Sequence, residues 1–96
     1  MLVVVSYDVS TVDAAGRRRL RNVAKACEDF GQRVQKSVFE CSVDPTQWTR
    51  LRLRLLATFN SDTDSLRFYF LGSKWRSRVE HYGSNAVRDP DDPLLV

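Results

Sequence analysis

Apolar and polar residues follow one another along the chain in blocks that predict β-strands and amphipathic helices. The first block is the run Leu2-Val3-Val4-Val5-Ser6-Tyr7-Asp8, in which apolar residues occupy both alternations. Such a run is typical of a strand covered on both faces, because successive side chains point to opposite sides of a sheet. The run ends on a carboxylate, so we expect Asp8 at the rim of the sheet.

Residues 14–30 have the period of an amphipathic helix. Ser10, Thr11 and Asp13 are typical helix-starting residues, and Gly31 is expected to end the helix. The apolar stripe that would face a core consists of Leu20, Val23, Ala24, Cys27 and Phe30.

A second helix is expected to begin at Asp44, because Pro45 suits the first helical position and Gln47 can complete a capping box. Trp48 begins its apolar stripe and is expected to be a packing anchor. Residues 60–65, which are polar and acidic, then predict a surface turn.

Residues 32–43 change their apolar alternation near Lys36-Ser37, which predicts two short strands joined by a sharp turn, or else a bulge. Residues 66–71 predict another strand with apolar groups on both alternations. Residues 79–83 and 86–88 predict short strands before a tail whose prolines cannot continue a ladder.

The order strand, helix, strand, strand, helix, strand, with a short extra strand, is the split βαβ or ferredoxin-like plan of an α+β protein. We assign residues 1–83 to this domain and residues 84–96 to a C-terminal strand and extended tail. Two helices cover one face of such a sheet, yet the strands carry apolar side chains on both faces. The uncovered face is therefore expected to meet the sheet of a second copy in a symmetric homodimer.

The length of 96 residues allows one domain with a single modest core. The leading apolar segment is too short to cross a membrane or to form a secretory signal, so we expect an intracellular protein with no membrane partner. Cys27 and Cys41 lack the spacing of a zinc site and are expected to be small core residues. His81 has no evident partner and is not expected to act as a base.

The net charge is +3, and the positive residues are clustered. Arg17, Arg18 and Arg19 stand near the start of the first expected helix, followed by Arg21 and Lys25. Consecutive arginines there oppose the helix macrodipole and repel one another, a cost that an anionic ligand would relieve. The cluster favours phosphate binding, with a solvated basic face as the alternative.

Two interpretations of Asp8 are open at this stage. A carboxylate at the end of a buried strand is held with little freedom, as suits a metal ligand or a reacting group. Alternatively, Asp8 caps the loop that leads into the first helix. One carboxylate is a poor magnesium site, but a homodimer's twofold axis could bring two copies of Asp8 together, and two carboxylates with water ligands suit Mg²⁺.

Four segments of the chain together resemble a known family. They are Val3-Val4-Val5-Ser6-Tyr7-Asp8, Arg17-Arg18-Arg19-Leu20, residues 31–40 and residues 75–83. The family is the small, universal CRISPR-associated adaptation protein, also called the CRISPR-associated endoribonuclease family, and the resemblance covers nearly the whole chain. The strand that ends in Tyr-Asp is its signature, and the Ser-Val-Phe-Glu run at residues 37–40 is almost as specific.

The resemblance implies a ferredoxin-like homodimer in the prokaryotic cytoplasm that captures short duplex DNA together with the CRISPR integrase. It also implies a Mg²⁺-dependent endonuclease that acts on single-stranded RNA or duplex DNA, with Asp8 of each protomer as the metal ligand. Tyr7 and Ser10 are then candidate catalytic residues that orient the water or the phosphate. The expected nucleic-acid-binding residues are Arg17, Arg18, Arg19, Arg33 and Phe39.

Two other functions are compatible with the sequence. In the first, the dimer is a non-catalytic DNA-binding scaffold in which arginines contact duplex phosphates and Asp8 is structural. In the second, the chain is an anion-binding metabolic domain on the same fold, although this explains neither Tyr7-Asp8 nor the density of arginines. Dependence on metal and on Asp8 would distinguish cleavage from scaffold binding.

Overall fold

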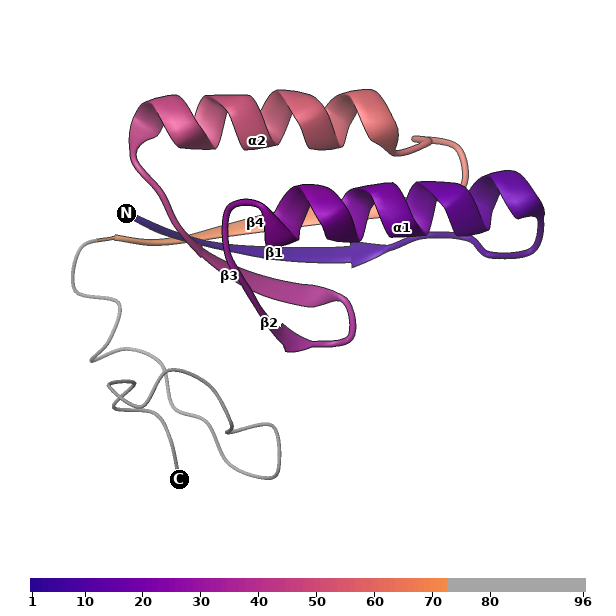
Figure 1. The fold of residues 1–96 in the computed structure, drawn as a ribbon, viewed down its shortest axis with the longest axis horizontal. Helices are drawn as coiled ribbons and strands as arrows, with labels where there is room; N and C mark the ends of the chain where they lie inside the picture. Colours follow the sequence, from indigo (N-terminus) through magenta and orange to yellow (C-terminus); the bar gives the residue numbers. More distant parts are fainter. Residues whose placement is uncertain (73–96) are drawn as a thin grey trace.

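The computed structural model describes residues 1–72, so the strands expected over residues 79–83 and 86–88, and the domain boundary after residue 83, lie outside the described residues. Figure 1 shows the elements in the order β, α, β, β, α, β, which confirms the predicted order. Their bounds are β1 Leu2–Asp8, α1 Ala14–Glu28, β2 Gln32–Gln35, β3 Val38–Ser42, α2 Pro45–Thr58 and β4 Ser65–Gly72.

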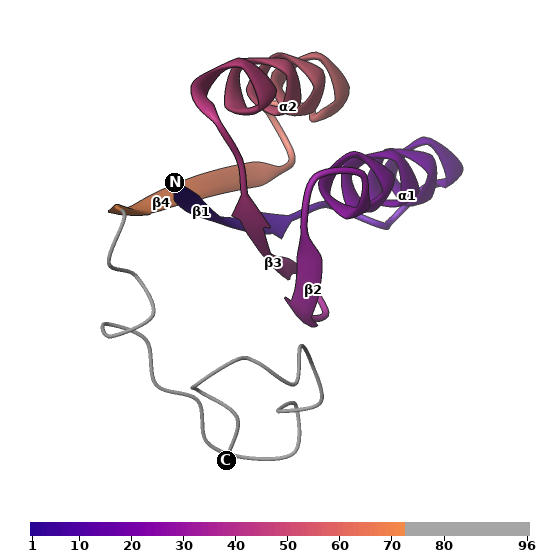
Figure 2. The same ribbon diagram turned by 60° about the vertical axis from the view of Figure 1, so that its left-hand side comes forward.

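The described strands form one antiparallel sheet in the order β2-β3-β1-β4. β1 lies between β3 and β4, so its backbone is hydrogen-bonded on both sides. Both helices lie on the same face of the sheet, and the opposite face is covered by neither of them (Figures 1 and 2). This arrangement confirms the expected α+β, ferredoxin-like fold.

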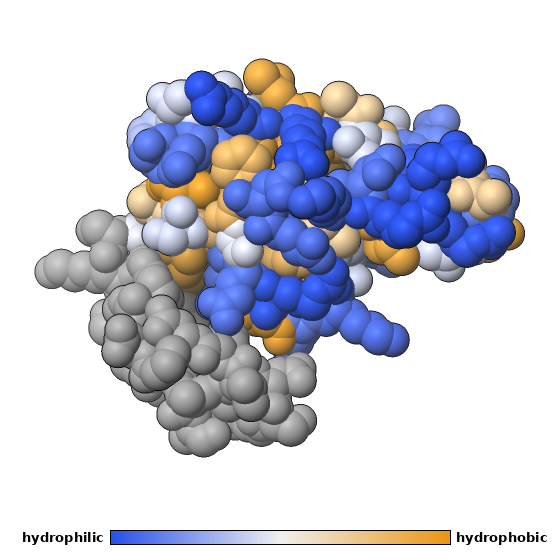
Figure 3. All heavy atoms as spheres, viewed as in Figure 1, coloured by the Kyte–Doolittle hydropathy of each residue, from blue (hydrophilic) through white to orange (hydrophobic). Residues whose placement is uncertain are grey.

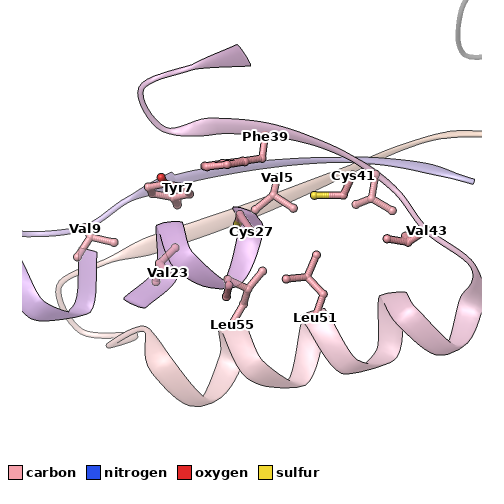
Figure 4. Close-up of a cluster of buried hydrophobic side chains, with 12 residues drawn as sticks. Val5, Tyr7, Val9, Val23, Cys27, Phe39, Cys41, Val43, Leu51 and Leu55 are labelled. Atoms are coloured by element: carbon pink, nitrogen blue, oxygen red, sulfur yellow. The ribbon is translucent and has the colours of Figure 1, made fainter. Parts of the chain in front are cut away.

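The core lies between the sheet and the two helices (Figure 4). From β1, Val3, Val5 and Tyr7 point toward the helices at the two-residue period of a strand. Cys27 and Cys41 are free and fully buried, which confirms their assignment as core residues. The other buried members of the core are Val9, Val23, Ala26, Phe39, Val43, Leu51 and Leu55.

Both helices begin where their capping residues predict. Asp13 caps α1 by accepting a hydrogen bond from the N–H of Gly16 at 2.7 Å, and Asp44 forms the expected capping box of α2. α1 ends at Glu28, earlier than expected, because the Phe30 N–H bonds to the carbonyl of Cys27 and tightens the last turn.

The β2–β3 unit contains both features that the sequence offered as alternatives. A turn lies at Lys36-Ser37, and the register shifts between Arg33 and Gln35, with Arg33 opposite Phe39 on β3. The shift explains the change of apolar alternation along this segment.

Trp48 of α2 packs edge-on against two phenylalanines of β4. Its ring centroid lies 4.8 Å from that of Phe68 and 5.5 Å from that of Phe70. Phe70 is 60% exposed and Phe68 is partly buried, so the three rings close the core at the β4 edge of the sheet. The expected role of Trp48 as a packing anchor is confirmed.

A shielded ion pair joins α1 to the turn before β4, and its carboxylate also accepts a hydrogen bond from the loop after β1. The Asp64 side chain has no exposed surface, and its oxygens lie 2.9 Å from Arg19 Nε and 3.0 Å from the backbone nitrogen of Ser10. The N–H of Asn60 also donates to Asp64 at 2.9 Å. The hydrogen bond from Arg19 is the main reason that the pKa of Asp64 lies well below its usual range, against the opposing effect of desolvation.

The core assignment predicts unequal effects of two leucine substitutions on α2. Leu55→Ala should lower the free energy of unfolding by about 2–5 kcal/mol, because it leaves a cavity among fully buried side chains. Leu53→Ala removes a side chain that is 58% exposed and should change the free energy of unfolding by less than about 0.5 kcal/mol. Urea unfolding followed by circular dichroism measures both, and equal effects would contradict the assignment.

The Arg19–Asp64 pair should stabilise the fold by an amount that depends on pH. Because the pKa of Asp64 is lower in the folded chain, the ionised carboxylate stabilises the fold above the unfolded pKa of about 3.9, and this contribution is lost as the pH falls below it. Asp64→Asn should therefore be less stable than the parent chain at neutral pH, and the difference should narrow between about pH 5 and pH 2.

Thermal unfolding of the two proteins across this range measures the difference. Asp62→Asn is the matched control, because Asp62 is an exposed acid of the same turn. A stability difference between the parent and Asp64→Asn that is the same at every pH would contradict the prediction.

Candidate nucleic-acid interface and metal ligand

Asp8 ends β1 on the sheet face that neither helix covers. Because side chains alternate along the strand, Asp8 points away from the core and Tyr7 points into it. The Asp8 side chain is exposed, and among residues 1–72 it has no hydrogen-bond or ion-pair partner. The alternative in which Asp8 caps the loop into α1 is wrong, because its side chain accepts no hydrogen bond within residues 1–72 and the N-cap of α1 is Asp13. A rigid central strand thus presents an uncommitted carboxylate at its end.

Tyr7 is a core residue whose hydroxyl reaches the β2–β3 turn. It is 4% exposed, and its hydroxyl donates to the carbonyl of Lys36 at 3.4 Å. Its ring lies beside that of Phe39 in Figure 4, with centroids 6.2 Å apart. Burial raises the pKa of Tyr7, and the nearby charge of Arg33 partly offsets this effect. The structure therefore separates Tyr7 from Asp8 within one chain.

Ser10 lies in the loop that follows Asp8 and is partly buried. Its N–H donates to Asp64, and its carbonyl lies so close to Gly16 that any side chain at Gly16 would collide with it. The loop is consequently held by the α2–β4 turn through Asp64 and lies close against α1 at Gly16. Ser10 thus has a fixed backbone position close in sequence to Asp8.

The consecutive arginines of α1 have different environments. Arg17 and Arg18 are exposed. The Arg17 side chain donates to the carbonyl of Thr11 at 3.3 Å, and the Arg18 side chain has no hydrogen-bond or ion-pair partner in the described part of the chain. Arg19 is partly buried and engaged by Asp64. Figure 3 shows hydrophilic side chains gathered over α1, and the exposed residues of this helix include Arg17, Arg18, Arg21 and Lys25, so the expected basic face is present.

Arg33 and Phe39 form a stack on the helix-covered side of the sheet. The guanidinium carbon of Arg33 lies 4.8 Å from the centroid of the Phe39 ring. Arg33 also pairs with Glu28 at 3.2 Å and donates to the carbonyl of Lys36. Phe39 is fully buried, and the Arg33 guanidinium lies over its ring. The ring therefore offers no exposed face for a base to stack on.

The predicted site residues therefore lie in separate places. Asp8 is on the face without helices, whereas Tyr7, Arg33 and Phe39 meet on the helix-covered side. Sequence reasoning missed Asp64, which holds the loop after β1. Its acidic turn is typical of the surface, and its partner Arg19 is 45 residues away in sequence, so no local signal could reveal the pair.

The described residues contain no group of three or more His, Cys, Asp or Glu side chains that could hold a metal ion. Burial raises the pKa of Cys27 to about 12 and that of Cys41 to about 11, so both remain neutral thiols, which are poor metal ligands. Asp8 fits a magnesium ion as an oxygen ligand, but a second acidic group must join it. No helix within residues 1–72 is long and apolar enough to cross a membrane.

Comparison with known proteins gives matches along the chain. A family model described as CRISPR associated protein Cas2 matches residues 1–79. The "CRISPR-associated endoribonuclease Cas2" of Nitratidesulfovibrio vulgaris is 57% identical over 96 residues, which cover 100% of this chain and 94% of that protein. The protein with the same description in Chlorobaculum tepidum is 58% identical over 100% of both chains. The "CRISPR-associated endonuclease Cas2" of Halalkalibacterium halodurans is 52% identical over 99% of both.

A solved structure agrees with these relatives. The crystal structure of Streptococcus pyogenes Cas2 at pH 6.5 superposes with a TM-score of 0.76 at 55% sequence identity, covering 86% of this chain and 100% of that chain. The sequence matches and the fold match thus concern the same family. Together with the ferredoxin-like sheet and its central strand ending in Tyr7-Asp8, they show that the chain belongs to the CRISPR-associated protein Cas2 family.

Proposed function

We propose that this chain acts in CRISPR adaptation as a cytoplasmic homodimer that binds short nucleic acid duplexes together with the CRISPR integrase, and that it is a Mg²⁺-dependent endonuclease. Membership of the Cas2 family supports the adaptation role. The descriptions of its relatives as endoribonuclease or endonuclease support phosphodiester cleavage. Single-stranded RNA and duplex DNA are the proposed substrates.

The face without helices supports the homodimer. Val4 on this face is partly buried, and its partner on β4, Tyr69, is 46% exposed. Apolar groups on a sheet face that no helix covers are stabilised when a second sheet packs on them. Asp8 lies on the same face, so a twofold axis passing near it would bring two carboxylates together.

The observation that carries the proposed cleavage is the exposed Asp8 carboxylate, which has no partner within residues 1–72. The two Asp8 side chains of a dimer would hold Mg²⁺. When bound, the ion would polarise a scissile phosphate and lower the pKa of a bound water. Arg17 and Arg18 would hold neighbouring phosphates, and Ser10 lies close enough in sequence to help orient the substrate. Tyr7 would contribute by fixing the β2–β3 turn.

The non-catalytic scaffold stays a second candidate because of the α1 surface. Arg17 and Arg18 are exposed on the first turns of the helix, where they suit duplex phosphates without any need for metal. Among the described residues, Asp8 is accompanied by no cluster of further acids. An Asp8 with a structural role, however, would be expected to have a partner within the fold.

Asp8→Ala is expected to lower metal-dependent cleavage at least about 100-fold, because a lost metal ligand removes several kcal/mol of transition-state stabilisation. Binding of a short DNA duplex should change little. Purified parent and variant are compared on duplex DNA and on single-stranded RNA, with Mg²⁺ and with EDTA. Asp62→Ala is the control, because it removes an exposed acid of the α2–β4 turn.

Cleavage by Asp8→Ala at the parental rate would contradict the assignment of Asp8. Duplex binding without any cleavage by the parent protein would favour the scaffold function.

Substitutions on α1 test the phosphate contacts. Arg17→Ala and Arg18→Ala should each weaken duplex binding several-fold and reduce the slope of log K against log salt concentration by about 1, with little loss of stability. Arg19→Ala should also lower the melting temperature, because it leaves Asp64 without its charged partner. Fluorescence anisotropy over a salt series measures binding. Arg52→Ala removes an exposed arginine of α2 as control, and an equal loss there would contradict a site on α1.

A further inference from the structure

A pocket of about 370 Å³ opens on the helix-covered side of the sheet. α1 forms one wall through Leu20, Arg21 and Ala24, and Tyr7 lines the pocket from β1. The opposite wall is β2 with the β2–β3 turn, which Figure 2 shows beside α1. This wall contributes Arg33, Lys36 and Ser37.

Hydrogen bonds fix the turn side of the pocket. The Lys36 carbonyl accepts from the Tyr7 hydroxyl at 3.4 Å and also from Arg33 Nη1. The Ser37 carbonyl accepts from the Tyr7 N–H at 3.0 Å. Arg33 is further held by Glu28 at 3.2 Å. A wall that is already in place costs a ligand little ordering entropy on binding.

The charges around the pocket favour an anion. The side chains of Arg21 and Lys36 are exposed, and neither side chain has a hydrogen-bond or ion-pair partner among residues 1–72. Arg33 adds a third positive charge, which its ion pair with Glu28 partly neutralises. Two uncommitted cations beside one opening attract a phosphate group, and a guanidinium can bind it through two parallel hydrogen bonds.

The rest of the lining favours an organic ligand. Leu20 and Ala24 are partly buried and supply apolar surface that an inorganic anion could not use. The volume is near the lower end of the range for small-molecule sites, roughly 300–1,000 Å³. We propose that this pocket binds a phosphorylated nucleoside, with the phosphate on Arg21 and Lys36 and the base against Leu20 and Ala24.

This site is separate from the proposed cleavage at Asp8, which lies on the opposite face of the sheet. The same chemistry is offered by a free nucleotide and by the 5′-phosphorylated end of a nucleic acid strand. Both sources present one phosphate beside one base. The experiment therefore includes an arm for each source.

Isothermal titration calorimetry on the full chain tests the proposal with AMP, adenosine and inorganic phosphate as probes. AMP should bind more tightly than either part alone. Arg21→Ala and Lys36→Ala should each raise the Kd of AMP about tenfold, the usual effect of losing a hydrogen bond to a charged group. Ala24→Leu should weaken AMP binding without any change of charge, because the larger side chain fills the pocket.

Two control variants accompany these substitutions. Arg52→Ala removes one exposed charge from α2 and should leave AMP binding unchanged. Asp8→Ala should also leave it unchanged, so failure of the cleavage proposal and failure of this one can be told apart. Circular dichroism spectra and melting temperatures establish that each variant is folded before its Kd is compared.

A second titration compares short single-stranded DNA with and without a 5′-phosphate. A preference for the phosphorylated strand that is lost in Lys36→Ala supports recognition of a strand end, and AMP binding without such a preference supports a free nucleotide. Equal affinity for inorganic phosphate and AMP would overturn the proposal. AMP binding unaffected in both Arg21→Ala and Lys36→Ala, or no AMP binding at millimolar concentration, would overturn it as well.

Discussion

The alternation of side chains along β1 decides which residues of this strand face the core and which face the side without helices. Val3, Val5 and Tyr7 of this strand are buried beneath the helices, and its backbone is paired on both sides by β3 and β4. A slip of one residue would move these apolar side chains to the face without helices and turn Asp8 toward the core. Burial of an unpaired carboxylate is costly, so packing of the core and exposure of Asp8 enforce the same register.

The loop after β1 positions α1 relative to the strand. Asp64 binds the backbone of Ser10 and the side chain of Arg19, while Gly16 lets the loop approach the helix closely. The helix is thereby held at its N-terminal end, where Arg17 and Arg18 remain in solvent. Arg19 thus stabilises the fold, whereas Arg17 and Arg18 are exposed at the place of the proposed phosphate contacts.

The functional residues are divided between the two faces of the sheet. The proposed metal ligand, Asp8, lies on the face without helices, where a second copy of the chain would supply the second carboxylate. The pocket on the other side is complete within one chain, where Tyr7, Arg33 and Lys36 are joined through the β2–β3 turn. This division accounts for Tyr7 and Asp8 being adjacent in sequence and yet serving different surfaces.

Local patterns along the chain predicted the order of the elements, the cap at Asp44 and the position of Asp8 at the end of a strand, because period and capping depend on residues close in sequence. The choice of Asp13 among three candidate helix-starting residues came from the structure. The sequence did not determine which arginine would be paired or that Phe39 would lie beneath Arg33. Those contacts join residues from different elements, and their geometry exists only after the sheet and helices have packed. The tertiary structure therefore decided how the basic residues are shared between stability and binding.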